Sequence, residues 1–170
     1  MMKRVTLGLF GAWLLHDAEE WFTLAPFSAR KAASGGGQVG LPWMRREISE
    51  AHAHTAVALV GVVIAAASAR GYRTEGRSRF YQAALAGFGL HGFSHLGMTV
   101  AERGYTPGVV TAPIVVLPFG YYAHRELART GVARPGLRTA LEGIAVAGGA
   151  LAASHALAGM LHPATSAATP

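Results

Sequence analysis

The segment GAWLLHDAEEWFTL places ionisable side chains within an otherwise apolar run of the chain. His16, Glu19 and Glu20 are spaced i, i+3, i+4, so in a helix they share one face, whereas Asp17 points about 100° away. Imidazole and carboxylate groups suit Fe, Zn or Mn, and the chain has no cysteine that could supply a thiolate. The pattern predicts a metal site or an acid/base site, with Asp17 beside it and not a ligand.

Two later segments offer pairs of the same residue types. Glu50 with His54, and His91 with His95, are each spaced i, i+4. Helical bundles build metal centres from carboxylates and imidazoles that converge from several helices in this way. One or two ions, most favourably Fe or Zn, are the cofactors that such a set predicts. The predicted metal ligands are His16, Glu19, Glu20, Glu50, His54, His91 and His95.

The composition favours a membrane protein built as a single unit. Of the 170 residues, 51% are hydrophobic and only 14% are charged. A helix of about 20 mostly apolar residues crosses the core of a bilayer, and five segments approach that length. We predict an all-α fold, an integral membrane bundle of about five transmembrane helices in a single domain. The predicted domain is 1–162, with spans near 5–27, 49–69, 80–101, 106–123 and 137–161, and a disordered tail at 163–170.

The charge pattern indicates the orientation of these spans. The 15 Lys and Arg residues gather in short clusters between the apolar runs, without the aromatic-interleaved stripe of nucleic-acid-binding proteins. With five spans, ten of them fall on the side of the N-terminus and five on the other. This favours a prokaryotic plasma membrane protein with a cytoplasmic N-terminus. The first span begins like a secretory signal, but no small-x-small cleavage pattern follows it, so we expect it to remain as a helix.

Ionisable residues from several spans are expected at one depth. At 1.5 Å per residue, residues 16–20 and 91–95 lie roughly 16 to 22 Å across a core about 30 Å thick. Residues 50–54 and His155 fall near the same outer level. The sequence leaves open whether His155 belongs to the site. The first three spans hold no Lys or Arg. The carboxylates therefore need a metal, a protonated histidine, or a proton of their own.

Two short motifs carry a resemblance to a known family. HDAEE at 16–20, the later histidines, and YTPG at 105–108 resemble the HXXEE-motif family of small integral membrane proteins, which is defined by sequence without an established activity. The resemblance runs from the first predicted helix into the fourth, and it implies importance for its motif residues without naming a reaction. Those residues are His16, Glu19, Glu20, Tyr105, Pro107 and Gly108.

The YTPG motif also has an interpretation that rests on its residues alone. Pro107 suits the first turn of a helix and Gly108 permits close approach, so the motif can start the fourth span. The hydroxyl of Tyr105 lies at the expected level of the site and could orient a carboxylate or donate a proton. Within the span, Pro113 and Pro118 are expected to kink the helix.

These residues leave three kinds of function open. The first is a membrane metalloenzyme that acts on a lipophilic small molecule or lipid, with Glu19, Glu20 and Tyr105 as catalytic residues. Oxidation is slightly favoured over hydrolysis because the site is a carboxylate-containing bundle site, although only one HxxxH pair is present. The second is a metal-free isomerase or cyclase in which the Glu19/Glu20 pair exchanges protons. The third is a non-enzymatic membrane protein that binds metal or protons. The substrate and the oligomeric state stay open.

Overall fold

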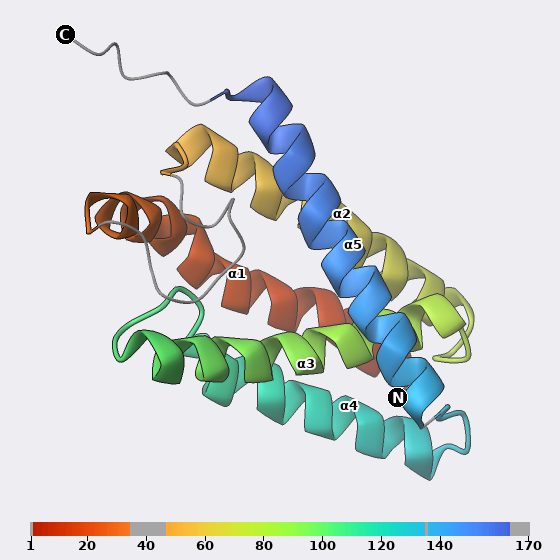
Figure 1. Cartoon of the computed structure of the whole chain (residues 1–170). Helices are drawn as coiled ribbons and strands as arrows, with labels where there is room; N and C mark the ends of the chain where they lie inside the picture. Colours follow the sequence, from red (N-terminus) through yellow and green to blue (C-terminus); the bar gives the residue numbers. More distant parts are fainter. Residues whose placement is uncertain (1, 35–46, 135, 164–170) are drawn as a thin grey trace, which may run out of the picture.

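A computed structural model describes residues 2–34, 47–134 and 136–163 of the chain. The fold of these residues is all-α, as predicted (Figure 1). Except for residue 163, the predicted disordered tail lies outside the described residues. The elements in chain order are α1 (Met2–Ala33), α2 (Glu50–Arg73), α3 (Arg79–Glu102), the π-helical turn η2 (Ala112–Val116), α4 (Leu117–Arg129) and α5 (Leu137–Leu161).

The helices follow the predicted segments, with one exception. α5 covers the predicted 137–161, and α3 exceeds the predicted 80–101 by one residue at each end. The exception is the fourth segment, because a turn occupies its start and η2 precedes α4. Proline lacks the N–H of a helical hydrogen bond and crowds the preceding turn, and Pro113 lies within η2. The expected irregularity therefore takes the form of a π-helical turn, and the prediction that YTPG starts the helix is wrong.

Serine side chains fix where the second and third helices begin. The Ser49 hydroxyl accepts a hydrogen bond from the backbone N–H of His52 at 3.1 Å. The Ser78 hydroxyl accepts one from the backbone N–H of Tyr81 at 3.3 Å. Such N-caps satisfy amide groups that the first helical turn leaves unpaired. They thereby set the register in which α2 and α3 present their side chains.

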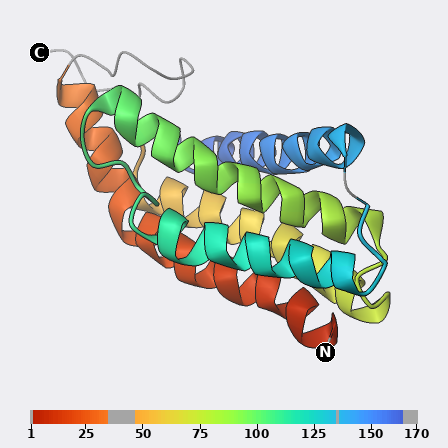
Figure 2. The same cartoon turned by 90° about the horizontal axis from the view of Figure 1, so that it is seen from below.

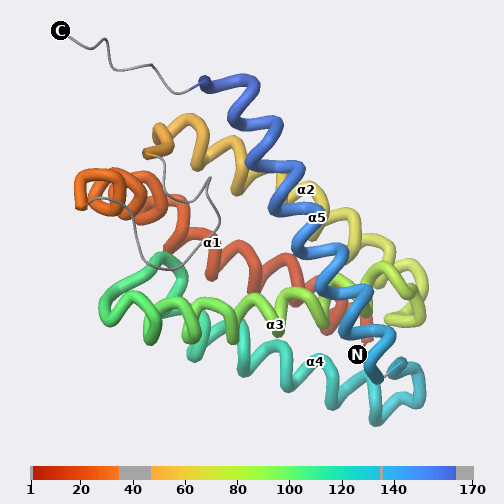
Figure 3. Tube along the Cα trace, viewed as in Figure 1, coloured from red at the N-terminus to blue at the C-terminus, as the bar shows by residue number. Residues whose placement is uncertain are grey.

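The helices α1, α2 and α3 are covered by η2 and α4 on one side and by α5 on another. η2 and α4 pack against both α1 and α3 (Figure 2), while α5 lies across α2 and α3. Figure 3 shows α5 crossing α3 near the start of both helices. The crossing is a direct backbone contact, since a Cβ atom at Gly87 would lie 2.5 Å from the carbonyl oxygen of Gly143. Small residues permit this close approach between helices.

The interior is filled by large apolar side chains, yet much of the exterior is apolar too. The core includes Leu9, Trp13, Tyr81, Leu85, Phe88, Val116 and Leu127. Every helix also exposes large apolar side chains, among them Phe22, Val62, Phe93, Tyr121 and Met160. Among the described residues, α2 and α5 are long and apolar enough to cross a membrane, by length and composition alone.

Candidate metal centre

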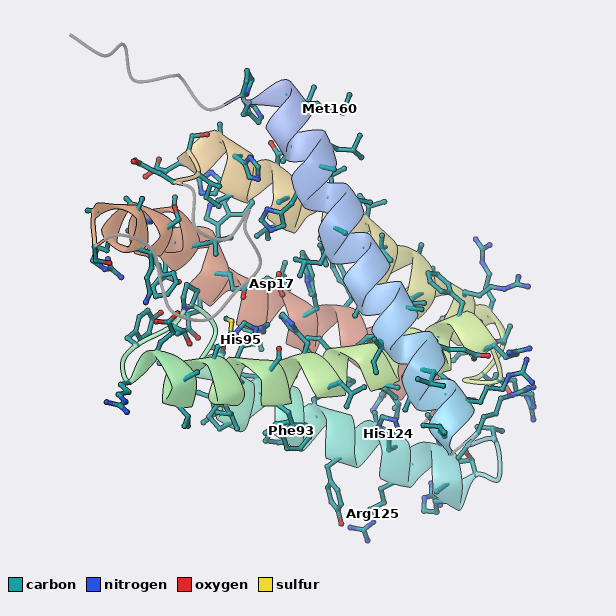
Figure 4. The ribbon with its side chains drawn as sticks, in the orientation of Figure 1. Asp17, Phe93, His95, His124, Arg125 and Met160 are labelled. Atoms are coloured by element: carbon teal, nitrogen blue, oxygen red, sulfur yellow. The ribbon has the colours of Figure 1, made fainter. Side chains whose placement is uncertain are left out.

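Side chains from α1 and α3 bring four of the predicted ligands together. His16 and Glu20 come from successive turns of α1, and His91 and His95 from successive turns of α3. One ligand atom of each residue lies within 4.8 Å of all the others. We refer to these four residues as the His/Glu cluster. In Figure 4, His95 lies on the side of α3 that faces α1.

The Nε2 atom of His95 lies among the other three ligand atoms. It is 2.8 Å from Nε2 of His91 and 3.2 Å from Nε2 of His16. Its distance to Oε1 of Glu20 is 3.4 Å. Two atoms bound to one ion at about 2.1 Å lie roughly 3.0 to 3.4 Å apart at tetrahedral or octahedral angles. Because a ring nitrogen carries at most one proton, hydrogen bonds cannot satisfy all three contacts. A cation that draws the four ligand atoms, which lie within 4.8 Å of one another, somewhat closer together would satisfy them.

The orientation of His16 is fixed by a residue that follows the YTPG motif. The Thr111 hydroxyl lies 2.8 Å from Nδ1 of His16 and donates to Oε2 of Glu19 at 2.6 Å. Since its only proton goes to the carboxylate, the hydroxyl accepts the Nδ1–H of His16. This assigns the tautomer whose Nε2 lone pair points into the cluster, an arrangement typical of metal-ligating histidines.

Glu19 lies outside the His/Glu cluster and contacts it through the Thr111 hydroxyl, which also binds His16. Its carboxylate accepts hydrogen bonds from the backbone N–H groups of Thr111 at 2.9 Å and Val110 at 3.3 Å. The Tyr105 hydroxyl also donates to it, at 2.8 Å. Burial, and then the adjacent carboxylate, raise the pKa of Tyr105, so the hydroxyl stays a donor. Glu19 and Tyr105 hold the turn before η2 against α1.

The YTPG motif contacts the cluster through its glycine. Gly108 has a φ of +82°, and a Cβ atom there would lie 2.6 Å from Cε1 of His95 and 2.8 Å from Cε1 of His16. Both the backbone conformation and the space thus require glycine. The Nδ1 atom of His95 is buried next to the backbone of Pro107, and it has no well-formed hydrogen bond to any residue that the structure describes. The motif forms one wall of the cluster.

The structure places Glu50 and His54 apart from the His/Glu cluster. Glu50 is the exposed first residue of α2. The His54 ring stacks on the indole of Trp21 at 3.9 Å, and its Nε2 lies 3.0 Å from the Trp21 carbonyl oxygen. The reason is the rotation of α2, which turns Ala53 and Val57 toward the interior. Of the seven predicted ligands, Glu19, Glu50 and His54 therefore do not belong to the His/Glu cluster.

A cavity of about 430 Å³ borders the cluster. Glu20 and His91 belong both to the cluster and to the cavity lining. Its volume falls within the range of about 300 to 1,000 Å³ typical of small-molecule sites. Ile144 and Leu151 of the lining are 56% and 47% exposed, so the cavity opens to the outside beside α5. Most other lining residues are apolar and come from α1, α2, α3 and α5, among them Val57, Ile64, Ala84, Phe88 and Val146.

The family model described as "protein of unknown function with HXXEE motif" matches residues 7–123, well over half of the chain. The chain belongs to the HXXEE-motif family. No curated protein and no solved structure matches it. The HXXEE match includes the whole His/Glu cluster and the YTPG motif, and it ends before α5.

The residues of the HXXEE motif therefore face two different sides of α1. His16 and Glu20 face the cluster, while Glu19 faces the turn before η2. Thr111, which joins the two, was not singled out by the sequence patterns. The only signal was a lone hydroxyl in the apolar run VVTAPIVV, three residues after Gly108. Its role depends on contacts between residues 95 positions apart.

Proposed function

We propose that this HXXEE-motif protein is an integral-membrane metalloenzyme that holds one ion at the His/Glu cluster and acts on a lipophilic molecule in the adjoining cavity. The observation that carries the proposal is the convergence of three imidazole nitrogens and one carboxylate oxygen within 4.8 Å. The same Glu20 and His91 line an apolar cavity. A bound ion would thus lie beside the space that a substrate fills.

The membrane part of the proposal is supported by the outer surface and by the distribution of charge. α2 and α5 are candidate spans, and all five helices expose large apolar side chains. Gly76, in the turn between α2 and α3, lies against Met2 of α1 and Leu127 of α4. One end of the bundle therefore brings together the basic segments around the start of α1, the turn between α2 and α3, and the last turns of α4. The positive-inside rule favours a cytoplasmic location for that end.

The number of ligands favours oxidation over hydrolysis. Catalytic zinc sites usually have three protein ligands and keep the fourth position for water. Four ligands from the His/Glu cluster would fill a tetrahedral zinc site. An ion that takes six ligands, such as Fe(II), would keep two positions open beside the cavity. We therefore favour an iron-dependent oxidation of the lipophilic molecule by dioxygen.

Elemental analysis of protein purified in mild detergent without chelators tests the metal site. We expect about one equivalent of iron, lost in the variants His16→Ala, Glu20→Ala and His91→Ala. The matched controls are Glu50→Ala and His54→Ala, which remove the same kinds of side chain outside the cluster and should keep the metal. Circular dichroism in the same detergent checks that each variant is folded.

The outcomes separate the classes of function. Zinc in place of iron, with a water-dependent reaction, would overturn oxidation and leave hydrolysis. No metal after reconstitution with Fe(II), Zn(II) and Mn(II) would overturn the metalloenzyme. The acid/base alternative would then take its place, because Glu19 is held by four hydrogen bonds while Glu20 borders the cavity. The two carboxyl groups therefore already occupy different environments.

A further inference from the structure

Three histidines outside the His/Glu cluster come together where the start of α2 lies against the end of α5. His52 belongs to the first turn of α2, His155 to the last part of α5, and His162 directly follows α5. Figure 1 shows these two helix ends at the same end of the bundle. The other five histidines of the chain are the three of the cluster, His54 and His124. We refer to His52, His155 and His162 as the α2/α5 histidine group.

The rings of His52 and His155 meet across the interface between the two helices. Nε2 of His52 lies 3.0 Å from Nδ1 of His155, and the ring centroids are 5.2 Å apart. Two nitrogen atoms bound to one ion at about 2.1 Å lie roughly 3.0 to 3.4 Å apart. The two nitrogens are therefore already spaced as ligands of a single ion.

His162 supplies a third imidazole beside this pair. Its Nε2 lies 3.0 Å from the hydroxyl oxygen of Thr55, which is one helical turn from His52 on α2. His52 and His162 are close enough for their charges to interact. His155 and His162 are seven residues apart, a spacing that keeps both on the side of α5 that meets α2.

A hydrogen bond alone does not account for three imidazoles at this place. The contact between His52 and His155 needs one donor and one acceptor, which the amide of Asn or Gln supplies equally well. Imidazoles that converge from two helices are typical of sites for divalent transition-metal ions. The residue type therefore favours an ion over a simple polar contact between the helices.

We propose that the α2/α5 histidine group binds a second divalent transition-metal ion, zinc or copper. His52 and His155 are the two ligands already in place, and His162 becomes the third when its ring turns away from Thr55. Zinc and copper favour imidazole nitrogen, whereas Mg(II) and Ca(II) favour oxygen ligands. The group shares no residue with the His/Glu cluster, so this inference does not rest on the proposed function.

An ion at this position would hold α5 to α2 beside the cavity. His155 lines the cavity from the same helix as Ile144 and Leu151, at which the cavity opens. A Cβ atom at Gly159 would lie 3.6 Å from Cε1 of His52, so the backbone of α5 already lies against that ring. Ligands from both helices would therefore fix the wall of the cavity that α5 provides.

Calorimetric titration of metal-free protein in detergent with Zn(II) tests the site. His52→Ala should bind one equivalent fewer than the parent protein. His155→Gln should lose the same equivalent, because its amide still forms a hydrogen bond but has no ring nitrogen. His54→Ala is the matched control, since it removes an imidazole two residues from His52 and should keep the parent stoichiometry. An unchanged stoichiometry in both His52→Ala and His155→Gln would overturn the proposal.

Electron paramagnetic resonance with Cu(II) counts the nitrogen ligands. The background is His91→Ala, which removes a ligand of the His/Glu cluster, and Glu20→Ala is a second background if circular dichroism shows that the first is unfolded. With one equivalent of Cu(II), we expect coupling to three nitrogens, and to two after His162→Ala. An excess of Mg(II) or Ca(II) should leave the spectrum unchanged. A spectrum that His162→Ala does not alter would contradict the third ligand.

The two metal proposals fail independently in the Zn(II) titration. One equivalent lost in His52→Ala, with a further equivalent lost when His91→Ala is added, would support both sites. If His52→Ala binds no Zn(II) at all, the α2/α5 histidine group is supported and the metal site at the His/Glu cluster is contradicted. If only His91→Ala lowers the stoichiometry, the α2/α5 histidine group alone is contradicted.

Discussion

The Thr111 hydroxyl lies 2.8 Å from Nδ1 of His16 and thereby connects the start of η2 to the HXXEE motif on α1. The same hydroxyl donates to Glu19, so the carboxylate orients the imidazole through one intervening oxygen. Partners of this kind hold the ring of a metal ligand and increase its basicity. The relationship gives the first glutamate of the motif a role that does not require it to touch the ion.

Replacing Thr111 tests this connection without removing a ligand. Thr111→Val keeps the shape of the side chain but loses the hydroxyl, so we expect metal affinity to fall by about 10 to 100-fold. Thr111→Ser keeps the hydroxyl and should stay within a few-fold of the parent. Competition with a chelator of known affinity measures both. An unchanged affinity in Thr111→Val would show that His16 does not depend on this hydrogen bond.

The two glutamates of the motif should respond differently to amide substitution. Glu20→Gln removes a charged ligand and should abolish tight metal binding. Glu19→Gln should cost about 10 to 100-fold, because its amide N–H₂ cannot accept the hydrogen bonds that surround the carboxylate. Since Glu19 acts through Thr111, the double variant Glu19→Gln/Thr111→Val should be no weaker than the worse single variant. Additive losses, read from the same chelator competition, would show that the two residues act separately.

The sequence predicts most of the fold because apolar runs and their breaks define the helices. The limits 137–161 of α5 match, and serine caps mark the starts of α2 and α3. The start of the fourth segment was not predictable, because proline indicates an irregularity without specifying a π-helical turn. Helical spacing also predicted the pairs from α1 and α3 that form the cluster. It did not predict the rotation of α2, which depends on how that helix packs on α1.

Gly108 offers a test that separates backbone strain from crowding of the cluster. Gly108→Ala places a Cβ atom against His95 and His16 at a positive φ. The backbone term alone costs about 1–2 kcal/mol, and displacement of the two rings should also lower metal affinity. Gly131→Ala is the control, because Gly131 has a φ of +70° and no atom of the described residues lies within 4 Å of its Cβ position. It should lose stability but bind metal normally.

Thermal unfolding in detergent measures the stability of these glycine variants. Competition with a chelator measures their metal affinity. A loss of stability in both variants with a loss of metal only in Gly108→Ala would match the geometry. Normal metal affinity in a folded Gly108→Ala protein would show that the wall formed by the YTPG motif is not required to hold the histidine rings.

Metal binding should be visible as stabilisation of the folded protein. An ion that binds the native state at 100 times its dissociation constant contributes about 2.7 kcal/mol, which raises the melting temperature. His95 is the ligand whose Nε2 contacts the other three, so His95→Ala should remove the whole metal-dependent shift. His54→Ala, which removes an imidazole stacked on Trp21, should melt at a lower temperature yet keep the shift. A shift that persists in His95→Ala would place the ion elsewhere in the protein.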